Sequence, residues 1–255
     1  MGGNHAIPDR GFACKVGQAV TVGPIIAVTC LSFEARVAAG PGVSVLCGTA
    51  RRYVDKLESA VRAGGSGIIS IGIAGGLAPG LSPGDWVIAA NVVSDGVRYA
   101  TDAQWSARLL GALPGSVYAD ISGVDAPVVR SEEKRALHRS AGTVAVDMES
   151  HIAARIAAAH GVPFAACRVI IDPAERTLPP AALVGMRSDG KPDVLAVAAS
   201  LLRQPKQVLA LLRVVADLRA ARTSLFRGRR LMGADLSFSQ VDAMQLDAMQ
   251  LEPSR

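Results

Sequence analysis

Four carboxylates stand close to the ends of apolar segments that are typical of buried strands. Glu34 follows "GPIIAVTC" (23–30), Asp147 and Glu149 follow "TVAV" (143–146), and Asp172 ends "VPFAACRVIID" (162–172). In largely parallel α/β sheets, ligands bind beyond the carboxyl ends of the strands. An apolar setting would raise the pKa of Asp172, which is what a general acid needs. Glu149 would suit another task, because a carboxylate can accept hydrogen bonds from the two vicinal hydroxyls of a ribose.

Each of these acids also has a purely structural explanation. Asp147 is the better N-cap for the helix that follows, since Asp accepts hydrogen bonds from the first unpaired amides. Glu149 alone would be favoured in a first helical turn by the helix macrodipole. Asp172 would be a solvated loop residue, although prolines in the next segment keep it from simply capping a helix. Glu34 would be an exposed residue on a helix surface.

Strands and helices alternate along the chain and position these acids. Strands that are apolar on both faces, separated by helices, indicate a mixed, largely parallel sheet with helices on both sides. The sequence therefore predicts a single α/β domain. The predicted strands are 23–30, 43–48, the first part of 66–77, 84–96, 116–123, 143–146 and 162–172. The predicted helices are 32–40, 49–65, 101–113, 131–141, 147–160 and one that begins near Pro205.

The ends of the chain differ from its middle. We expect a flexible N-terminus over residues 1–22, the α/β domain over 23–232, and a tail over 233–255 that carries the repeat "DAMQLDAMQL" (242–251). The length of 255 residues and the 50% hydrophobic content suffice for one large core.

Composition excludes several classes of function. Only 4% of the residues are aromatic and the net charge is only +5, so a nucleic-acid-binding surface is not expected. The four cysteines lack CxxC spacing and the four histidines lack metal-ligand spacing. We therefore expect a reduced, cytoplasmic protein without a metal. The sequence shows neither a signal peptide nor an apolar run of the ~18 residues that a membrane span needs.

The glycine-rich segment "GIAGGLAPGLSPGD" (72–85) follows the third predicted strand. It matches neither the GxGxxG pattern nor the P-loop, which needs a Lys followed by Ser or Thr. The glycines allow either a close approach of the backbone to a ligand or a tight turn.

In combination, "SIGIAGGLAPGLSPGD", "VDMES" and "RVIIDPAE" resemble the nucleoside phosphorylase/nucleosidase superfamily, and in particular its methylthioadenosine/S-adenosylhomocysteine nucleosidase branch. The resemblance runs from about Pro24 to Asp172. It implies that Met148 packs on a ribose and that Glu149 binds the ribose hydroxyls. It also implies that Asp172 protonates N7 of the departing purine. The residue before this acid is usually Ser in the superfamily, whereas this chain has Ile171.

The same resemblance assigns roles near the nucleophile. In "TCLSFEAR", Glu34 stands three residues after Leu31, as does the water-activating Glu of the nucleosidase branch. The backbone of Ile73, Ala74, Gly75 and Gly76 would approach the sugar or the nucleophile. The superfamily's phosphorylases place an Arg on the strand before the glycine loop, whereas "GIISIGIAGG" has none. The sequence thus favours water, with phosphate as co-substrate the second choice and no other cofactor.

Two arginines and the oligomeric state complete this picture. Arg51 and Arg52 are the candidates for a phosphate site, unless they lie on an exposed helix surface. The superfamily resemblance also implies a homodimer or a larger assembly.

A narrower resemblance concerns the substrate. "VDAPVVRSEEKRALHRSAGTVAVDMES" and "RVIIDPAERTLPPAAL" are similar to the hopanoid-associated phosphorylases, also described as adenosylhopane nucleosidases. This implies release of adenine from adenosylhopane, an adenosine-bearing hopanoid lipid, during hopanoid side-chain biosynthesis. The alternatives are methylthioadenosine or another soluble purine nucleoside as substrate, and a nucleoside-binding protein without turnover.

The C-terminal section is basic. Residues 201–230 contain eight Lys or Arg and one acid, Asp217, interspersed with apolar residues. Such a segment either forms an ordinary helix that packs on the core or rests on anionic lipid head groups at the inner face of the membrane.

Overall fold

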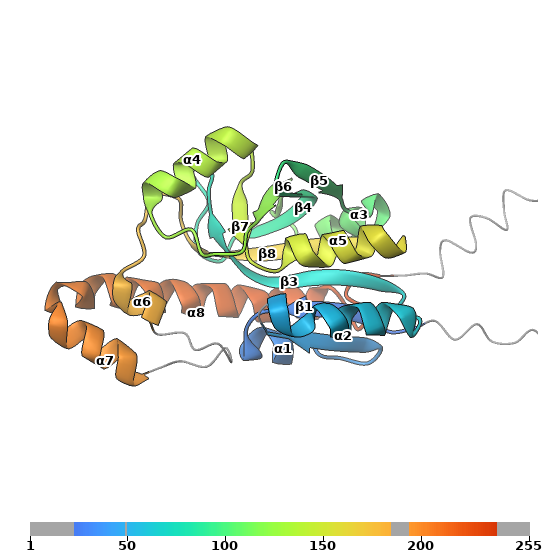
Figure 1. Ribbon diagram of the computed structural model, residues 1–255, viewed down its shortest axis with the longest axis horizontal. Helices are drawn as coiled ribbons and strands as arrows, with labels where there is room; N and C mark the ends of the chain where they lie inside the picture. Colours follow the sequence, from blue (N-terminus) through green and yellow to red (C-terminus); the bar gives the residue numbers. More distant parts are fainter. Residues whose placement is uncertain (1–22, 49, 185–193, 239–255) are drawn as a thin grey trace, which may run out of the picture.

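The structure is a computed structural model that describes residues 23–48, 50–184 and 194–238. Figure 1 shows a twisted sheet with helices on both sides. This arrangement confirms the predicted fold, a single α/β domain with a mixed sheet. The predicted N-terminal segment 1–22 and the "DAMQL" repeat lie outside the described residues.

The described residues form one sheet of eight strands, eight α-helices and one short 3-10 helix. The strands are β1 (Ile25–Thr29), β2 (Val43–Cys47), β3 (Gly67–Gly76), β4 (Trp86–Ser94), β5 (Val97–Ala100), β6 (Val117–Gly123), β7 (Ala145–Asp147) and β8 (Phe164–Asp172). The helices are α1 (Ser32–Ala38), α2 (Ala50–Arg62), α3 (Ala103–Ala112), α4 (Ser131–Ala141), α5 (Ser150–His160), α6 (Pro180–Val184), α7 (Val194–Arg203), the 3-10 helix η1 (Pro205–Gln207) and α8 (Val208–Leu231).

Two predicted strands differ from the observed ones. The third strand continues through its glycines as far as Gly76, because both β8 and β7 pair with this stretch. The fourth predicted strand turns back on itself, so that β4 and β5 form an antiparallel hairpin. Its turn uses Asp95 and Gly96, both with positive φ, a combination typical of tight hairpin connections.

The strand pairing closes part of the sheet into a ring. β3 pairs with β8 along most of its length and with β7 at its end. β7 continues to β6, β6 to β4, and β4 returns to β8. Five strand pairs are parallel and three are antiparallel, as expected for a mixed, largely parallel sheet. The ring brings the ends of β3, β7 and β8 together.

Two apolar cores lie on the two faces of the sheet. Because side chains alternate along a strand, Ile26 and Ile68 face one core while Ile25 and Ile69 face the other. The first core is completed by residues of α2 and α5, and the second by residues of α1, α3 and α8. Strands that are buried on both faces explain the continuous apolar runs in the sequence.

The domain extends past the predicted boundary at residue 232. Leu236 and Phe238 are buried in the second core. Trp105 Nε1 donates to the carbonyl of Leu236 at 2.9 Å, and the rings of Trp105 and Phe238 lie 4.5 Å apart between centroids. The segment 233–238 is therefore part of the folded body and not of a tail.

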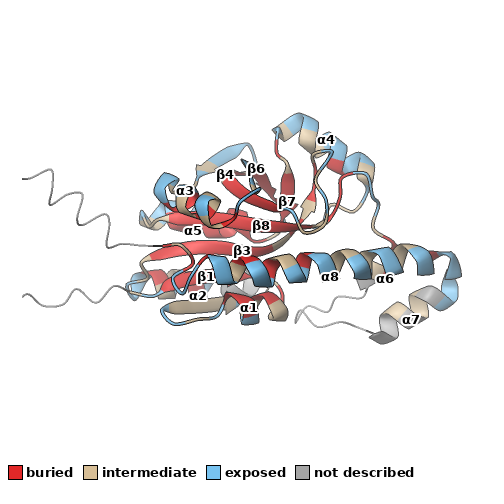
Figure 2. Cartoon of the chain, turned by 180° about the vertical axis from the view of Figure 1, so that it is seen from behind, coloured by how far each residue is buried: buried red, intermediate tan, exposed pale blue. Residues whose placement is uncertain are grey.

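The long helix α8 presents its first half differently from an ordinary core-facing helix. Only its second half contributes fully buried residues, among them Ala221 and Leu225. Earlier in the helix, Leu209 is 70% exposed and Leu212 is 60% exposed. Figure 2 shows α8 largely exposed along the side turned to the viewer. Among the described residues, no helix is long and apolar enough to cross a membrane.

Candidate functional site

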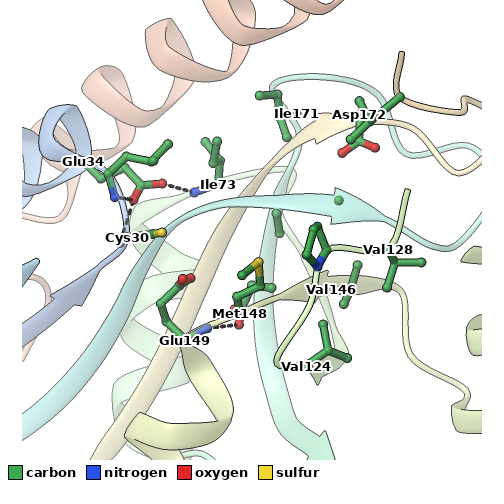
Figure 3. A pocket seen from close by; sticks show the side chains of 16 residues that line it. Cys30, Glu34, Ile73, Val124, Val128, Val146, Met148, Glu149, Ile171 and Asp172 are labelled. Atoms are coloured by element: carbon green, nitrogen blue, oxygen red, sulfur yellow. Dashed lines mark hydrogen bonds between the residues drawn. The ribbon is translucent and has the colours of Figure 1, made fainter. Parts of the chain in front are cut away.

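A cavity of about 160 Å³ opens at the carboxyl ends of β1, β7 and β8, beside the second half of β3. Figure 3 shows the residues that line it. The lining includes almost every residue predicted for the site, namely Glu34, Ile73, Ala74, Gly75, Met148, Glu149 and Asp172. Gly76 does not line the cavity, because it packs against the end of β8 and the backbone that follows. The remaining lining residues are mainly apolar, so the acids face a largely apolar cavity.

Glu34 is buried and its carboxylate is fixed by three backbone amides. Oε2 accepts hydrogen bonds from the amides of Cys30 at 3.0 Å and Leu31 at 2.7 Å, and Oε1 accepts one from the amide of Ile73 at 2.8 Å. The first two bonds close the N-terminus of α1, and the third joins α1 to the glycine-rich strand. Burial raises the pKa of Glu34, while Arg168 and the three amides oppose this rise. The predicted alternative of an exposed helix residue is wrong.

Asp147 and Glu149 divide the tasks that the sequence suggested. Asp147 Oδ1 accepts hydrogen bonds from the amides of Glu149 at 3.0 Å and Ser150 at 2.8 Å, so its side chain holds the chain at the start of α5. The N-cap position itself is Glu149 and not the predicted Asp147, because the helix begins at Ser150. Glu149 lines the cavity, where its carboxylate lies against the thiol of Cys30. Burial raises the pKa of Glu149 to about 7, against the opposing effect of Arg168. Glu149 can therefore exchange a proton close to neutral pH.

Arg168 is the charged residue beneath this part of the site, and sequence reasoning did not assign it a role. It is fully buried in the middle of β8. Its Nε lies 2.5 Å from Asp147 Oδ2, and its Nη2 lies 3.9 Å from Glu149 Oε2 and 3.0 Å from Ser150 Oγ. A charged residue within an apolar strand could have been noticed, because a buried charge requires partners.

Gly72 explains how Glu34 and Arg168 come so close together. A Cβ atom at position 72 would lie 2.5 Å from Glu34 Oε1 and 2.8 Å from Arg168 Nη1. These distances are shorter than normal contacts, so any side chain at position 72 would displace Glu34 or Arg168. At Gly72 the backbone approaches the protein's own acid, Glu34, whereas the next three residues of the strand line the cavity.

Asp172 ends β8 at the other end of the cavity, where Figure 3 shows it apart from Glu34 and Glu149, with Met148 between them. Its partner is Lys134 of α4, a fully buried residue whose Nζ donates to Asp172 Oδ2. Burial raises the pKa of Asp172, and the Lys134 ammonium opposes this rise. Ile171, which stands in place of the usual Ser, lines the cavity without offering a hydrogen bond. No pattern in the sequence singled out Lys134.

The remaining predicted residues are Arg51 and Arg52. Their backbone belongs to the first turn of α2, but their side chains lie outside the described part of the chain. Within the described residues, no group of His, Cys, Asp or Glu side chains is arranged to hold a metal ion.

Solved structures with the same fold include three bacterial enzymes. The methylthioadenosine/S-adenosylhomocysteine nucleosidase of Helicobacter pylori shares 14% identity, with a TM-score of 0.60 over 85% of this chain and 98% of the other. The futalosine hydrolase of H. pylori shares 16% identity, with a TM-score of 0.58 over 85% and 98%. The S-adenosylhomocysteine nucleosidase of Streptococcus pyogenes shares 16% identity, with a TM-score of 0.55 over 78% and 98%. At these identities the likeness concerns the fold.

The comparison with curated proteins gave no match. The comparison with family models gave one that covers the greater part of the chain. The model of the phosphorylase superfamily matches residues 34–203, which include Glu34, the glycine-rich strand, Glu149 and Asp172. The chain belongs to the phosphorylase superfamily.

Proposed function

We propose that the protein is a purine N-ribosyl hydrolase that releases adenine from an adenosine-bearing substrate. One observation carries this proposal: buried carboxyls occupy both ends of one cavity, Glu34 and Glu149 at one end and Asp172 at the other. Cleavage of an N-glycosidic bond needs an acid for the leaving base and a base for the attacking water. Because the acids lie at opposite ends of the cavity, each of these two needs has its own candidate residue.

Each acid then has one step. Glu149 accepts hydrogen bonds from the ribose hydroxyls, while Met148 packs on the sugar. Glu34 takes a proton from water as the oxygen forms its bond to C1′ of the ribose. The bond from C1′ to N9 breaks, its electron pair goes to the purine, and Asp172 delivers a proton to N7. The products are adenine and a ribosyl compound with a hydroxyl at C1′.

The charge of the site supports water as the nucleophile. Three carboxyls, those of Glu34, Asp147 and Glu149, surround the single guanidinium of Arg168. Among the described residues, the other buried cation is Lys134, which is paired with Asp172. Neither cation is left over to balance a phosphate dianion, and the excess of carboxyls would repel it. Phosphorolysis would need a further cationic group, for which Arg51 and Arg52 remain the candidates.

The substrate we propose is adenosylhopane, on the strength of the sequence resemblance. The size of the cavity bears on where the triterpenoid part of this substrate would lie. About 160 Å³ is below the usual range of ligand pockets, so a triterpenoid chain would have to extend outside the cavity. Methylthioadenosine is the second candidate, because two of the structures with this fold are nucleosidases named for methylthioadenosine or S-adenosylhomocysteine.

Purified protein in phosphate-free buffer tests both the reaction and the substrate. We expect adenine release from adenosylhopane that exceeds the release from methylthioadenosine, does not increase on adding phosphate, and stops in Glu34→Gln. The matched control is Asp55→Asn, which changes an exposed acid on α2. Activity that requires phosphate and yields a phosphorylated ribose would refute hydrolysis. Release from methylthioadenosine alone would refute the lipid substrate.

We further propose that α8 rests on an anionic membrane, where a hopanoid substrate is found. The exposed residues of its first half are mainly apolar, with Leu209 and Leu212 the most exposed of these, and they include Arg213. Further along the same side, Arg219, Arg227 and Arg230 are exposed as well. Leucines that enter the interface and arginines that meet lipid phosphates are the two components of peripheral binding. Arg229 is not one of these contacts, since it donates to the carbonyl of Ala38 at 3.3 Å.

Sedimentation with vesicles tests this surface. The wild type should bind vesicles that contain phosphatidylglycerol and not neutral ones, and salt should weaken the binding. Replacing Arg219, Arg227 and Arg230 with Gln should weaken the binding about as much as salt does, since each arginine contributes on the order of 1 kcal/mol to the free energy of binding. Absence of wild-type binding would overturn the proposal. So would a dimer that dissociates in Leu209→Ser/Leu212→Ser, because α8 would then be an interface between copies.

A further inference from the structure

Lys134 occupies an unusual position for a lysine. It lies near the start of α4. The adjacent residues Glu133 and Arg135 are exposed, yet the side chain of Lys134 is fully buried. Its ammonium donates to Asp172 Oδ2, to the carbonyl of Pro173 at 3.1 Å and to the carbonyl of Arg176 at 3.1 Å. An ammonium has three hydrogens, so all three are used.

These three bonds connect α4 to the end of β8. Burying a lysine is costly unless its charge is paired and its hydrogens are accepted. Here the acceptors are one catalytic carboxyl and two carbonyls of the loop that directly follows it. Lys134 therefore fixes both the side chain of Asp172 and the backbone that carries it.

The two oxygens of Asp172 have different surroundings. Oδ2 is held by Lys134, whereas Oδ1 lies beside the glycine-rich strand, where a Cβ atom at Gly75 would stand 3.2 Å from it. Gly75 lines the cavity, as does Asp172. One oxygen is thus anchored in the protein, and the other is placed where a purine would lie. The neighbouring Ile171 cannot orient the carboxyl through a hydrogen bond.

We propose that Lys134 is the positioning residue of the acid: it anchors Oδ2 of Asp172, directs Oδ1 toward the purine, and stabilises the carboxylate left after the proton has moved. This inference rests on the proposed function of Asp172. As the C1′–N9 bond breaks, the proton on Oδ1 passes to N7 and Asp172 becomes negative beside an ammonium. The developing charge is therefore neutralised within the protein, which makes Asp172 a better acid.

Other charged groups that face Asp172 do not replace Lys134. Asp217 of α8 lies across a neighbouring small cavity and forms an ion pair with Arg176. Arg213 of α8 lines the same cavity. Asp217 opposes ionisation of Asp172, and its effect on the pKa of Asp172 is smaller than that of Lys134. Lys134 is the only one of these groups that bonds to the carboxyl itself.

The test compares the pH profile of adenine release in Lys134→Met with the wild type. The matched control is Arg135→Met, an exposed cation on the same helix. Without the ammonium, Asp172 should hold its proton to higher pH, so the alkaline fall of activity should move up by about one pH unit or more. The rate at the optimum should drop about tenfold or more. Lys134→Gln should show the same shift of the pH profile, because it also removes the charge, although its amide can still form hydrogen bonds.

A double variant separates positioning from a general effect on folding. In the Asp172→Asn background, Lys134→Met should cause little further loss, because Lys134 acts through Asp172. Equal losses in both backgrounds, or a wild-type pH profile in Lys134→Met, would overturn the inference. Should the single variant fail to fold, Lys134→Gln and the double variant, which leaves no unpaired buried charge, decide the question.

A measurement without turnover separates this inference from the proposed function. The carboxyl carbon of Asp172 can be followed by NMR as pH is varied, with Asp172→Asn to assign the signal. Its titration should move to higher pH in Lys134→Gln, whichever substrate is cleaved and even if none is. Wild-type protein that releases no adenine would refute the proposed function, whereas an unchanged titration would refute the role of Lys134.

Discussion

Replacing Glu149 with Gln should stabilise the fold at alkaline pH while it weakens substrate binding. Burial raises the pKa of Glu149 from 4.5 to about 7, so the folded protein keeps this proton where the unfolded chain has lost it. Stability that depends on a raised carboxyl pKa is fully present below the unfolded value and is lost as pH rises through the folded value. The relevant window is therefore pH 4.5 to about 7.

The size of the effect follows from the same values. At about 1.4 kcal/mol per pH unit, the rise in pKa corresponds to a cost of up to about 3 kcal/mol once Glu149 is ionised. A glutamine occupies the same space and carries no charge. The free energy of unfolding of Glu149→Gln, relative to wild type, should thus be larger by up to about 3 kcal/mol at pH 8 than at pH 5, which means a more stable variant at alkaline pH.

Urea unfolding at both pH values measures this difference, with circular dichroism as the signal. Glu132→Gln is the matched control, because the side chain of Glu132 is 71% exposed and its removal changes the net charge equally. The control should show little dependence on pH. If Glu149→Gln were destabilised more at pH 8 than at pH 5, Glu149 would instead be held as a stabilising anion by Arg168. The account of the buried acids given above would then be wrong.

Two further changes test the packing beneath the cavity. Gly72→Ala should displace Glu34 from Arg168 and reduce adenine release at least about tenfold, whereas Gly111→Ala, where a methyl group meets no atom within 4 Å, should not. Activity of Gly72→Ala equal to that of Gly111→Ala would contradict the close approach. Arg168→Met should destabilise the fold by about 3–5 kcal/mol, and more at pH 8 than at pH 5, because several buried carboxyls lose their counter-charge. Thermal unfolding measures this, with the exposed Arg155→Met as control.

The acids of the site could be predicted from sequence because each stands next to a recognisable apolar strand. Glu34, Glu149 and Asp172 follow buried strands, and the topology of a parallel sheet brings such strand ends together. The structure places all three around one cavity. Local rules also predicted that Asp147 binds the amides at the start of α5, although they placed the N-cap two residues too early.

The cations of the site could not be predicted in the same way. The partners of Lys134 lie about forty residues later in the chain, and those of Arg168 lie about twenty and a hundred residues earlier. Their burial is decided by tertiary packing, which local periodicity does not record. Lys134 in particular stands among exposed charged residues of an amphipathic helix. The antiparallel pairing of β4 with β8, which closes the ring, is similarly distant in sequence.

In the proposed reaction, the two buried cations of the described residues, Arg168 and Lys134, let the two ends of the cavity move protons in opposite directions. At one end, Glu34, Asp147 and Glu149 share the single charge of Arg168, so a proton added there relieves repulsion between carboxyls. This favours taking a proton from water. At the other end, Asp172 has the ammonium of Lys134 to itself, so the loss of its proton creates a neutral pair. This favours giving a proton to the purine. Arg168 thus faces three carboxyls at one end, and Lys134 faces one carboxyl at the other. This arrangement suits hydrolysis and disfavours the binding of a phosphate anion.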